Sequence, residues 1–289
     1  MKFKIIHCIA QYLLKHNIKG RGRLITSLSN LLPTPQKKQE IQTSYHCKMY
    51  INAVENKSLE HKLYCTGTYE MGTLQIIEKI LKPGDSVVDA GANIGVITLL
   101  AAKCVGADGH VISIEPHPQT AQRLRENIAL NLFENTTVIE SALGEKNDTG
   151  ILYLDDQWQD SGGASLINNI ERTCTQTQIT IQALDSIQIP TPITLIKMDV
   201  EGYELEALKG GASRLSQKES PVLIIEAGDN PEEILTYLKS LNTYQAFRLE
   251  KGKQVPSKLI PVKDAKAVEG SDNMFCLLPC HIAKYPELF

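Results

Sequence analysis

No run of about 18 apolar residues, the length that a membrane-spanning helix requires, occurs anywhere in the sequence. The basic N-terminus is interrupted by polar residues and is followed by no small-residue cleavage site, so it is a poor signal peptide. The seven cysteines include no Cys-x-x-Cys pair, which favours reduced thiols over a disulfide framework. A formal net charge of only −3 gives no sign of the basic face typical of proteins that bind nucleic acids. We therefore expect a cytoplasmic protein with no transmembrane segment and no nucleic-acid partner.

The sequence does contain five short apolar runs that are rich in β-branched residues, as the buried strands of a parallel sheet are. They span Ser86–Asp89, His110–Glu115, Thr136–Ser141, Ile193–Asp199 and Pro221–Glu226. Helix-length segments separate the first three runs, so the pattern predicts βαβ units and a doubly wound α/β sheet. Each run ends in an acidic or small polar residue. Because such a sheet binds its ligand beyond the carboxyl ends of its strands, these residues are expected to face one ligand.

The loop that follows the first run is the segment that says most about the identity of that ligand. Gly91 allows a tight turn and Gly95 allows close helix–sheet packing, while Glu115 could accept both hydrogen bonds of a ribose diol. The spacing is not the dinucleotide fingerprint, because Asn93 stands where a central glycine would admit a pyrophosphate. Asp89, just before the loop, suits a cationic ligand, and S-adenosylmethionine is a cation with a ribose. The alternative is an ordinary strand-to-helix turn with a helix-packing glycine.

Four segments resemble the FkbM-type S-adenosylmethionine-dependent methyltransferases. They are DAGANIG (89–95), SIEPHP (113–118), IKMDVEGYELEALKGG (196–211) and LIIEAG (223–228). The resemblance extends from about Thr66 to Gly228, and its KMDVEG segment is the most specific part. It implies a class I methyltransferase fold, which is a Rossmann-like, seven-stranded, doubly wound α/β sheet whose last strand is antiparallel. It also implies methylation of hydroxyl groups on natural products or sugars.

The remaining pattern predicts how the chain is organised around this sheet. Residues 1–65 are expected to hold a helical segment and a β-hairpin that reaches to residue 69. Residues 66–289 form the methyltransferase domain, with an insertion of β and loop character at 145–185. The N-terminal helix is expected to dock on this domain, or alternatively to lie on a membrane surface or form part of a substrate lid. Helices are predicted over 72–81, 94–104, 118–131, 203–217 (broken at Gly210-Gly211) and 231–241, and the last strands over 245–250 and 273–278.

The residues expected to contact the cofactor lie mainly at the strand ends, and the resemblance weakly adds Glu70. They are Glu70, Asp89, Gly91, Asn93, Gly95, Glu115, His117, Ser141, Ala142 and Asp199. Asp199 and Glu201 are the candidate catalytic residues, as a base or as groups that orient the acceptor. Asp199 could instead only cap the turn that follows it. Lys197 should share a face of its strand with Asp199 and form an ion pair with it.

Three further questions stay open in the sequence. Asp199, Glu226, Asp229 and Asn230 offer oxygen ligands that suit Mg²⁺, although Asn230 also reads as a helix N-cap, and the main expectation is that no metal is bound. The acceptor is expected to be a small molecule with a hydroxyl group. N-methylation of an amide or amine on a peptide natural product is the alternative, and a nucleotide-binding module without catalysis is a third. Oligomerisation is possible.

Overall fold

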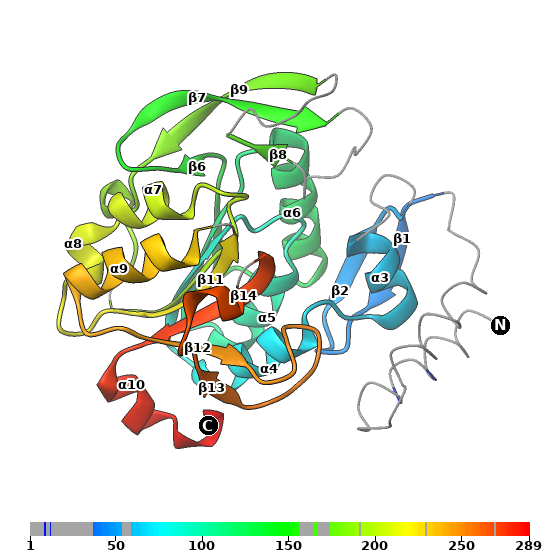
Figure 1. The fold of residues 1–289 in the computed structure, drawn as a ribbon. Helices are drawn as coiled ribbons and strands as arrows, with labels where there is room; N and C mark the ends of the chain where they lie inside the picture. Colours follow the sequence, from blue (N-terminus) through cyan, green and yellow to red (C-terminus); the bar gives the residue numbers. More distant parts are fainter. Residues whose placement is uncertain are drawn as a thin grey trace.

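The computed structural model describes residues 37–53, 59–155, 164–166, 174–190, 192–228, 230–268 and 270–289, together with Ile9 and Tyr12 (Figure 1). The expected N-terminal helix therefore lies outside the described residues. At the centre is one eight-stranded sheet. Its strands, in spatial order, are β13 (Leu259–Pro261), β12 (Gln245–Leu249), β14 (Gly270–Leu277), β11 (Val222–Gly228), β10 (Ile193–Met198), β3 (Ser86–Ala90), β4 (His110–Ile114) and β5 (Thr136–Ile139).

The pairing within this sheet confirms the expected class I methyltransferase fold. Strands β11, β10, β3, β4 and β5 run parallel to one another. Strand β14 inserts antiparallel between β11 and β12. The sequence did not predict β13, which adds an eighth strand at the edge through antiparallel pairing with β12. The carboxyl ends of the five parallel strands lie along one edge, as the strand-end residues required.

Alternate residues of the central strands pack into two different cores, so the sheet is covered on both faces. Val87 belongs to the core that contains Leu99 of α5, whereas its neighbour Val88 belongs to the core that contains Leu208 of α7. On the first face lie α4 (Met71–Ile80), α5 (Val96–Val105) and α6 (Pro118–Leu130); on the second lie α7 (Glu204–Lys209), α8 (Ala212–Leu215) and α9 (Pro231–Leu241). Burial of both faces explains why the strand sequences are continuously apolar rather than alternating.

The hairpin expected over 46–69 was wrong in its second half. The antiparallel pair is β1 (Gln39–Gln42) with β2 (Lys48–Ile51), joined by a turn in which Thr43 bonds Cys47. The chain then forms α3 (Leu59–Thr66) instead of a second strand. Leu59 and Leu63 are four residues apart and both buried, which is a helical spacing. The weak alternation of so short a segment could not distinguish the two periods.

The insertion forms a second, smaller sheet with the order β6-β9-β7-β8, which lies at the top of Figure 1. Its strands are β6 (Ala142–Leu143), β7 (Asp148–Asp155), β8 (Ala164–Ser165) and β9 (Cys174–Gln182). The run predicted as one strand, Thr136–Ser141, ends earlier than expected. Its first part pairs in the central sheet as β5, and after Ser141 the chain enters the second sheet.

The expected helix break at Gly210-Gly211 is confirmed, since α7 ends before the pair and α8 begins after it. A Cβ at Gly210 would lie 2.0 Å from the carbonyl oxygen of Gly144. The two glycines therefore lie where the backbone at the two ends of the insertion, at Gly144 and Ala183, comes close to the helix. Short 3-10 turns (η2 Leu184–Ser186, η3 Ala265–Val268, η4 Pro286–Leu288) and α10 (Pro279–Lys284) complete the fold. Among the described residues, no helix is both long and apolar enough to cross a bilayer.

Candidate active site

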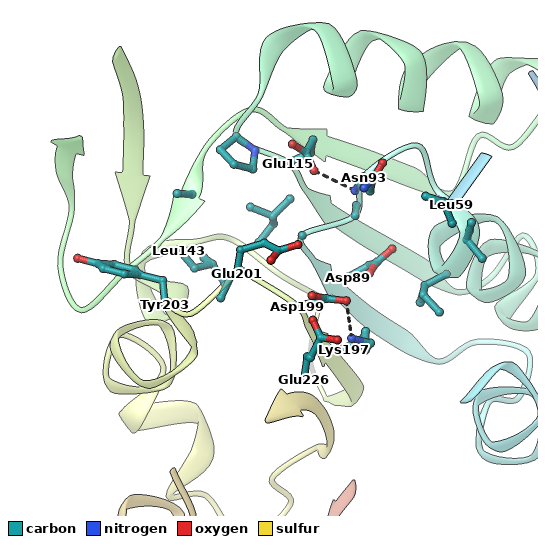
Figure 2. Close-up of a pocket in the computed structure, with 18 of the residues that line it drawn as sticks. Leu59, Asp89, Asn93, Glu115, Leu143, Lys197, Asp199, Glu201, Tyr203 and Glu226 are labelled. Carbon is teal, nitrogen blue, oxygen red and sulfur yellow. Dashed lines mark hydrogen bonds and ion pairs between the residues drawn. The ribbon is translucent and has the colours of Figure 1, made fainter. Parts of the chain in front are cut away.

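A cavity of about 420 Å³ opens beyond the carboxyl ends of the parallel strands (Figure 2). Most of the expected site residues line it, namely Glu70, Asp89, Gly91, Asn93, Glu115, Ser141, Ala142, Asp199 and Glu201. Gly95 and His117 are not among its lining residues. Glu226 also lines it, together with Lys197 and Lys253. Elements far apart in the sequence therefore meet at one site.

The loop after β3 depends on glycine at two positions. Gly91 has a left-handed φ of +75°, and its N–H donates to the carbonyl of Ile114 at 2.9 Å. A Cβ at Gly91 would lie 1.7 Å from the carbonyl oxygen of Asp199, so the ends of β3 and β10 are in direct backbone contact. Gly95 has φ +100°, and a Cβ there would meet the side chain of Leu124 on α6 at 2.6 Å. Gly95 therefore shapes the start of α5 rather than the cavity wall.

Glu115 is buried at the end of β4 and fixes the neighbouring loops. One carboxylate oxygen accepts the backbone N–H of Asn93 at 2.9 Å, and the other accepts that of His117 at 3.0 Å. Burial raises the pKa of Glu115 to about 7 in spite of these two bonds. Each oxygen retains a lone pair, so the carboxylate could still accept a ribose diol. The ring of His117 contacts the Thr120 hydroxyl at 2.8 Å, outside the cavity lining.

Asp89 forms a buried acidic wall of the same cavity. The hydroxyl of Thr98 donates to its carboxylate at 2.6 Å, and Lys197 is its register partner on β10. Burial raises the pKa of Asp89 to about 6, although the Thr98 hydrogen bond and the Lys197 charge act in the opposite direction. A group so poorly solvated gains most from a cationic ligand.

Ser141 supplies a direct test of whether a cofactor fits here. Its side chain is 1% exposed and lines the cavity, yet its hydroxyl has no hydrogen-bond partner among the described residues. Around it, Ala142, Leu143, Leu152 and Leu166 form an apolar wall to which the second sheet contributes. An apolar slot with one buried, unpaired hydroxyl suits a flat heterocyclic base that offers a few polar atoms.

We expect Ser141→Ala to weaken binding of S-adenosylhomocysteine by about 1 kcal/mol, the net worth of one hydrogen bond. Stability without ligand should not fall, because the variant removes a hydroxyl that is buried without a partner. Calorimetric titration and thermal unfolding measure the two effects. Ser220→Ala is the matched control, since Ser220 is equally buried but bonds the carbonyls of Leu215 and Gln217. The control should lose stability and keep its affinity. Unchanged affinity in Ser141→Ala would contradict the placement of the base.

The structure distinguishes between the two roles expected for Asp199, a group that acts at the cavity and a cap for the following turn. Its carboxylate lies 3.3 Å from the ammonium group of buried Lys197, which confirms the expected ion pair. It does not cap the following turn. The carboxylate of Glu204 does so, by accepting the N–H groups of Val200 at 3.0 Å and Gly202 at 3.3 Å. Burial alone would raise the pKa of Asp199, but Lys197 and a hydrogen bond with Glu226 outweigh it and lower the pKa to about 2.

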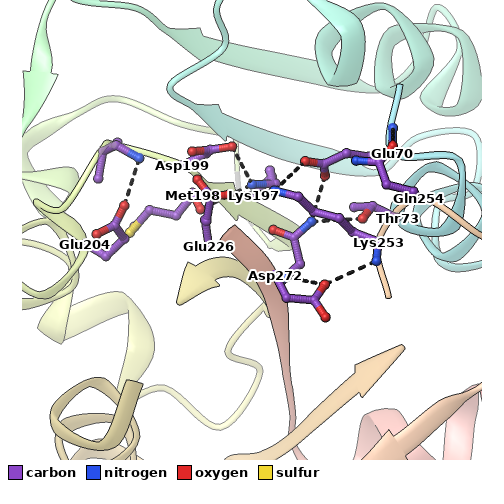
Figure 3. Close-up of polar contacts among 12 residues, drawn as sticks. Glu70, Thr73, Lys197, Met198, Asp199, Glu204, Glu226, Lys253, Gln254 and Asp272 are labelled. Carbon is purple, nitrogen blue, oxygen red and sulfur yellow. Dashed lines mark hydrogen bonds and ion pairs between the residues drawn. The ribbon is translucent and has the colours of Figure 1, made fainter. Parts of the chain in front are cut away.

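Behind Asp199 lies a network of buried charges that sequence reasoning missed in part (Figure 3). Lys253, in the loop between β12 and β13, places its ammonium group 2.8 Å from Glu70 and 2.5 Å from Glu226. Asn273 of β14 donates to the other oxygen of Glu70 at 2.7 Å. Glu70 is therefore bonded within the protein and also lines the cavity. No local signal marks Lys253, since its partners belong to a helix start and a strand distant in the sequence.

Glu201, the second catalytic candidate, lies at the cavity wall with a left-handed φ of +53° and an exposed side chain. Although the residue as a whole is exposed, partial desolvation of its carboxylate beside the cavity, with the charges of Asp199 and Glu204, raises its pKa to about 8. The hydroxyl of Ser165 in β8 donates to the carbonyl of Glu201 at 3.0 Å. The insertion thus holds the loop that carries Glu201.

The geometry gives little support to the alternative prediction of a magnesium site. Two of its four proposed ligands, Asp199 and Glu226, face the ammonium groups of Lys197 and Lys253. Asn230 is exposed, and Asp229 lies outside the described residues. Within the part of the chain that the structure describes, no group of three His, Cys, Asp or Glu side chains could hold a metal ion. Lysines supply the positive charge beside these carboxylates.

The fold and this cavity define the class of protein, a class I S-adenosyl-L-methionine-dependent methyltransferase. The family profile described as the methyltransferase FkbM domain matches residues 89–251, more than half of the chain. The chain therefore belongs to the FkbM methyltransferase family. A profile of protein-L-isoaspartate(D-aspartate) O-methyltransferase matches residues 22–145. The cofactor is S-adenosyl-L-methionine, and the cavity residues fit it.

Two curated relatives differ greatly in how much they share with this chain. The hexuronic acid methyltransferase AglP of Haloferax volcanii is 27% identical over 169 residues, which are 58% of this chain and 67% of that protein. The arsenite methyltransferase of Halobacterium salinarum is 43% identical over 65 residues, only 22% of this chain and 16% of that protein. Among solved structures, M. jannaschii TYW2 in complex with AdoMet has a TM-score of 0.42 and 16% identity, covering 85% of this chain and 86% of that one.

Proposed function

We propose that the protein transfers a methyl group to a hydroxyl oxygen of a small molecule, a sugar or a related metabolite. The observation that carries this proposal is the charge of the cavity. Six carboxylates line it, from Glu70, Asp89, Glu115, Asp199, Glu201 and Glu226, against the two lysines Lys197 and Lys253. This excess of negative charge suits a cationic cofactor, disfavours an anionic acceptor group beside it, and provides bases for a hydroxyl proton.

The proposed division of work follows from where the residues lie. When bound, S-adenosyl-L-methionine supplies a methyl group activated by its positive sulfur. Glu115 would hold the ribose, and Ser141 with its apolar neighbours would hold the base. Asp89 would face the positive end of the cofactor, because no lysine in the described part of the chain forms a hydrogen bond with its desolvated carboxylate. Asp199 stands at the acceptor side, where its ion pair with Lys197 fixes its orientation.

A sugar is the acceptor class with independent support, because this chain is similar to a hexuronic acid methyltransferase. The negative charge of this cavity favours a neutral sugar over a hexuronic acid, whose carboxylate it would repel. Three methyl glycosides separate the possibilities: β-glucoside with neutral hydroxyls, β-glucuronide with a carboxylate, and β-glucosaminide with an amine. With cofactor labelled on its methyl group, we expect label that resists mild alkali, as an ether does, on the neutral glucoside. Alkali-labile label on the glucuronide would mean carboxyl methylation. Label confined to the glucosaminide would favour the N-methylation alternative.

The same assay, repeated with excess chelator, tests whether methyl transfer requires a metal ion. Lysines already neutralise the carboxylates of the candidate metal cluster, so transfer should continue unchanged in its presence. If chelation stops transfer and Mg²⁺ restores it, the acceptor hydroxyl is activated by a bound ion and the proposal that lysines serve this site fails.

A further inference from the structure

Two carboxylates at the acceptor side of the cavity are close enough to share a proton. Glu226 follows the fully buried part of β11 and faces Asp199, which follows β10, and Figure 2 shows their carboxylates side by side. Each carboxylate shifts the pKa of the other, as two acids within reach of a shared proton do. Two ionised carboxylates side by side repel each other, so the pair is more stable with one proton between the two groups. They therefore behave as one pair with two successive ionisations.

Groups from every surrounding element act on this pair. The cations are Lys197 of β10 and Lys253 of the β12–β13 loop, and the acidic groups are Glu70, Asp89, Glu201, Glu204 and the phenol of Tyr69. Lys197 contacts Asp199, whereas Lys253 contacts Glu226. These surroundings shift the pKa values of the two carboxyl groups in opposite directions. The pKa of Asp199 is lowered to about 2, while burial and the neighbouring Asp199 raise the pKa of Glu226 to about 8.

We infer that Glu226 is the catalytic base that takes the proton of the acceptor hydroxyl, with Asp199 as its hydrogen-bonding partner and Lys253 as its positioning residue. This inference rests on the proposed O-methyl transfer. Lys253 holds one oxygen of Glu226 at 2.5 Å, which directs the other oxygen towards Asp199 and the cavity. Asp199 alone is a poor base, because an acid this strong gains little by accepting a proton.

The proposed step conserves atoms and electrons. Loss of the shared proton to solvent first leaves both carboxylates ionised and frees an oxygen of Glu226 for the acceptor. The O–H bond of the acceptor then breaks, and its proton passes to Glu226. The electron pair of that oxygen forms the bond to the methyl carbon, while the electron pair of the broken carbon–sulfur bond remains on sulfur. Glu226 is 16% exposed, so it can return the proton to water.

The pH dependence of methyl transfer to methyl β-glucoside tests this assignment. Turnover of the wild type should rise with pH and level off above about 8, where the pair loses its proton. Glu226→Gln should lower turnover by about 10²–10⁴-fold and remove that rise. Glu250→Gln, at an exposed position on the same side of the fold, should behave as wild type. A Glu226→Gln variant with wild-type turnover and an unchanged pH profile would overturn the assignment.

Two variants of the neighbours should move the profile in opposite directions. Lys253→Met removes a cation that favours the ionised form of Glu226, so the rise should shift to higher pH, and Lys253→Arg should restore it. Asp199→Asn removes a negative charge beside Glu226, so the rise should shift to lower pH. If Asp199 were the base, Asn would abolish the rise instead of moving it. Lys251→Met, an exposed lysine of the same loop, is the control.

A measurement without cofactor or acceptor separates this inference from the proposed function. In protein labelled with ¹³C at the glutamate carboxyl carbon, two signals should titrate near pH 8, those of Glu226 and Glu201, and the one that disappears in Glu226→Gln belongs to the pair. If that signal is present but no acceptor hydroxyl is methylated, the proposed function fails and the proton-sharing pair stands. If hydroxyl transfer occurs but no such signal exists, the proposed function stands and the inference fails.

Discussion

Replacing Glu115 with alanine should weaken binding of S-adenosylhomocysteine by about 2–4 kcal/mol, or about 30- to 1000-fold. The variant loses a buried carboxylate placed to accept two ribose hydroxyls. It also releases the backbone N–H groups of Asn93 and His117, which shape the loops on either side. Titration calorimetry measures the loss. Glu140→Ala is the control, since Glu140 is an exposed glutamate near the end of β5 that forms an ion pair with Arg125.

The same carboxylate should make cofactor binding sensitive to pH. Burial raises the pKa of Glu115 to about 7, so protonation below that pH removes acceptor capacity from the ribose site. Affinity of the wild type should therefore fall as the pH decreases from 8 to 6. Glu115→Gln should bind weakly at both values and lose most of this dependence. A variant that retains full affinity across the range would remove Glu115 from the cofactor site.

Gly91→Ala should cost about 3–5 kcal/mol of folding free energy, since overpacking adds to a left-handed backbone. The new Cβ would lie 1.7 Å from the carbonyl oxygen of Asp199, so the ends of β3 and β10 must separate. Cofactor binding should be lost together with stability. Thermal or denaturant unfolding and titration with S-adenosylhomocysteine measure the two effects.

Gly106→Ala provides a matched control for that substitution. Gly106 also has a positive φ, of +63° with ψ −171°, a conformation that side chains other than glycine rarely adopt, but a Cβ there would meet nothing within 4 Å. Its cost should be only the conformational part, about 1–3 kcal/mol, and cofactor affinity should not change. If both variants lose the same stability, the contact between the Gly91 loop and Asp199 is not what requires glycine.

The sequence predicted the elements whose signal is local. A buried strand followed by a polar residue is visible in a few adjacent letters, so the sequence alone predicts that the strand ends at Asp89, Glu115 and Asp199 lie at one sheet edge. The helix break at the glycine pair 210–211 was predicted from an equally local signal, because two adjacent glycines disfavour a helix wherever they occur. These features need no knowledge of what lies across the fold.

What could not be predicted depends on partners distant in the chain. Lys253 gains its role only from the folding of its loop against Glu70 and Glu226. Capping of the turn after β10 was the alternative role expected for Asp199. The residue that caps this turn is Glu204, one helical turn later, because its side chain reaches back to Val200. Likewise, α3 was mistaken for a strand, since eight residues contain too few periods to decide between the two patterns.

The hydrogen bond from Ser165 to the carbonyl of Glu201 links two parts of the cavity that perform different tasks. The second sheet supplies Leu152 and Leu166 to the wall proposed for the base, and through Ser165 it also holds the loop beside the acceptor. Changes in the length or sequence of the insertion would then alter affinity for the cofactor and choice of acceptor together. Relatives that diverge in this segment would not be free to change acceptor while keeping the cofactor site as it was.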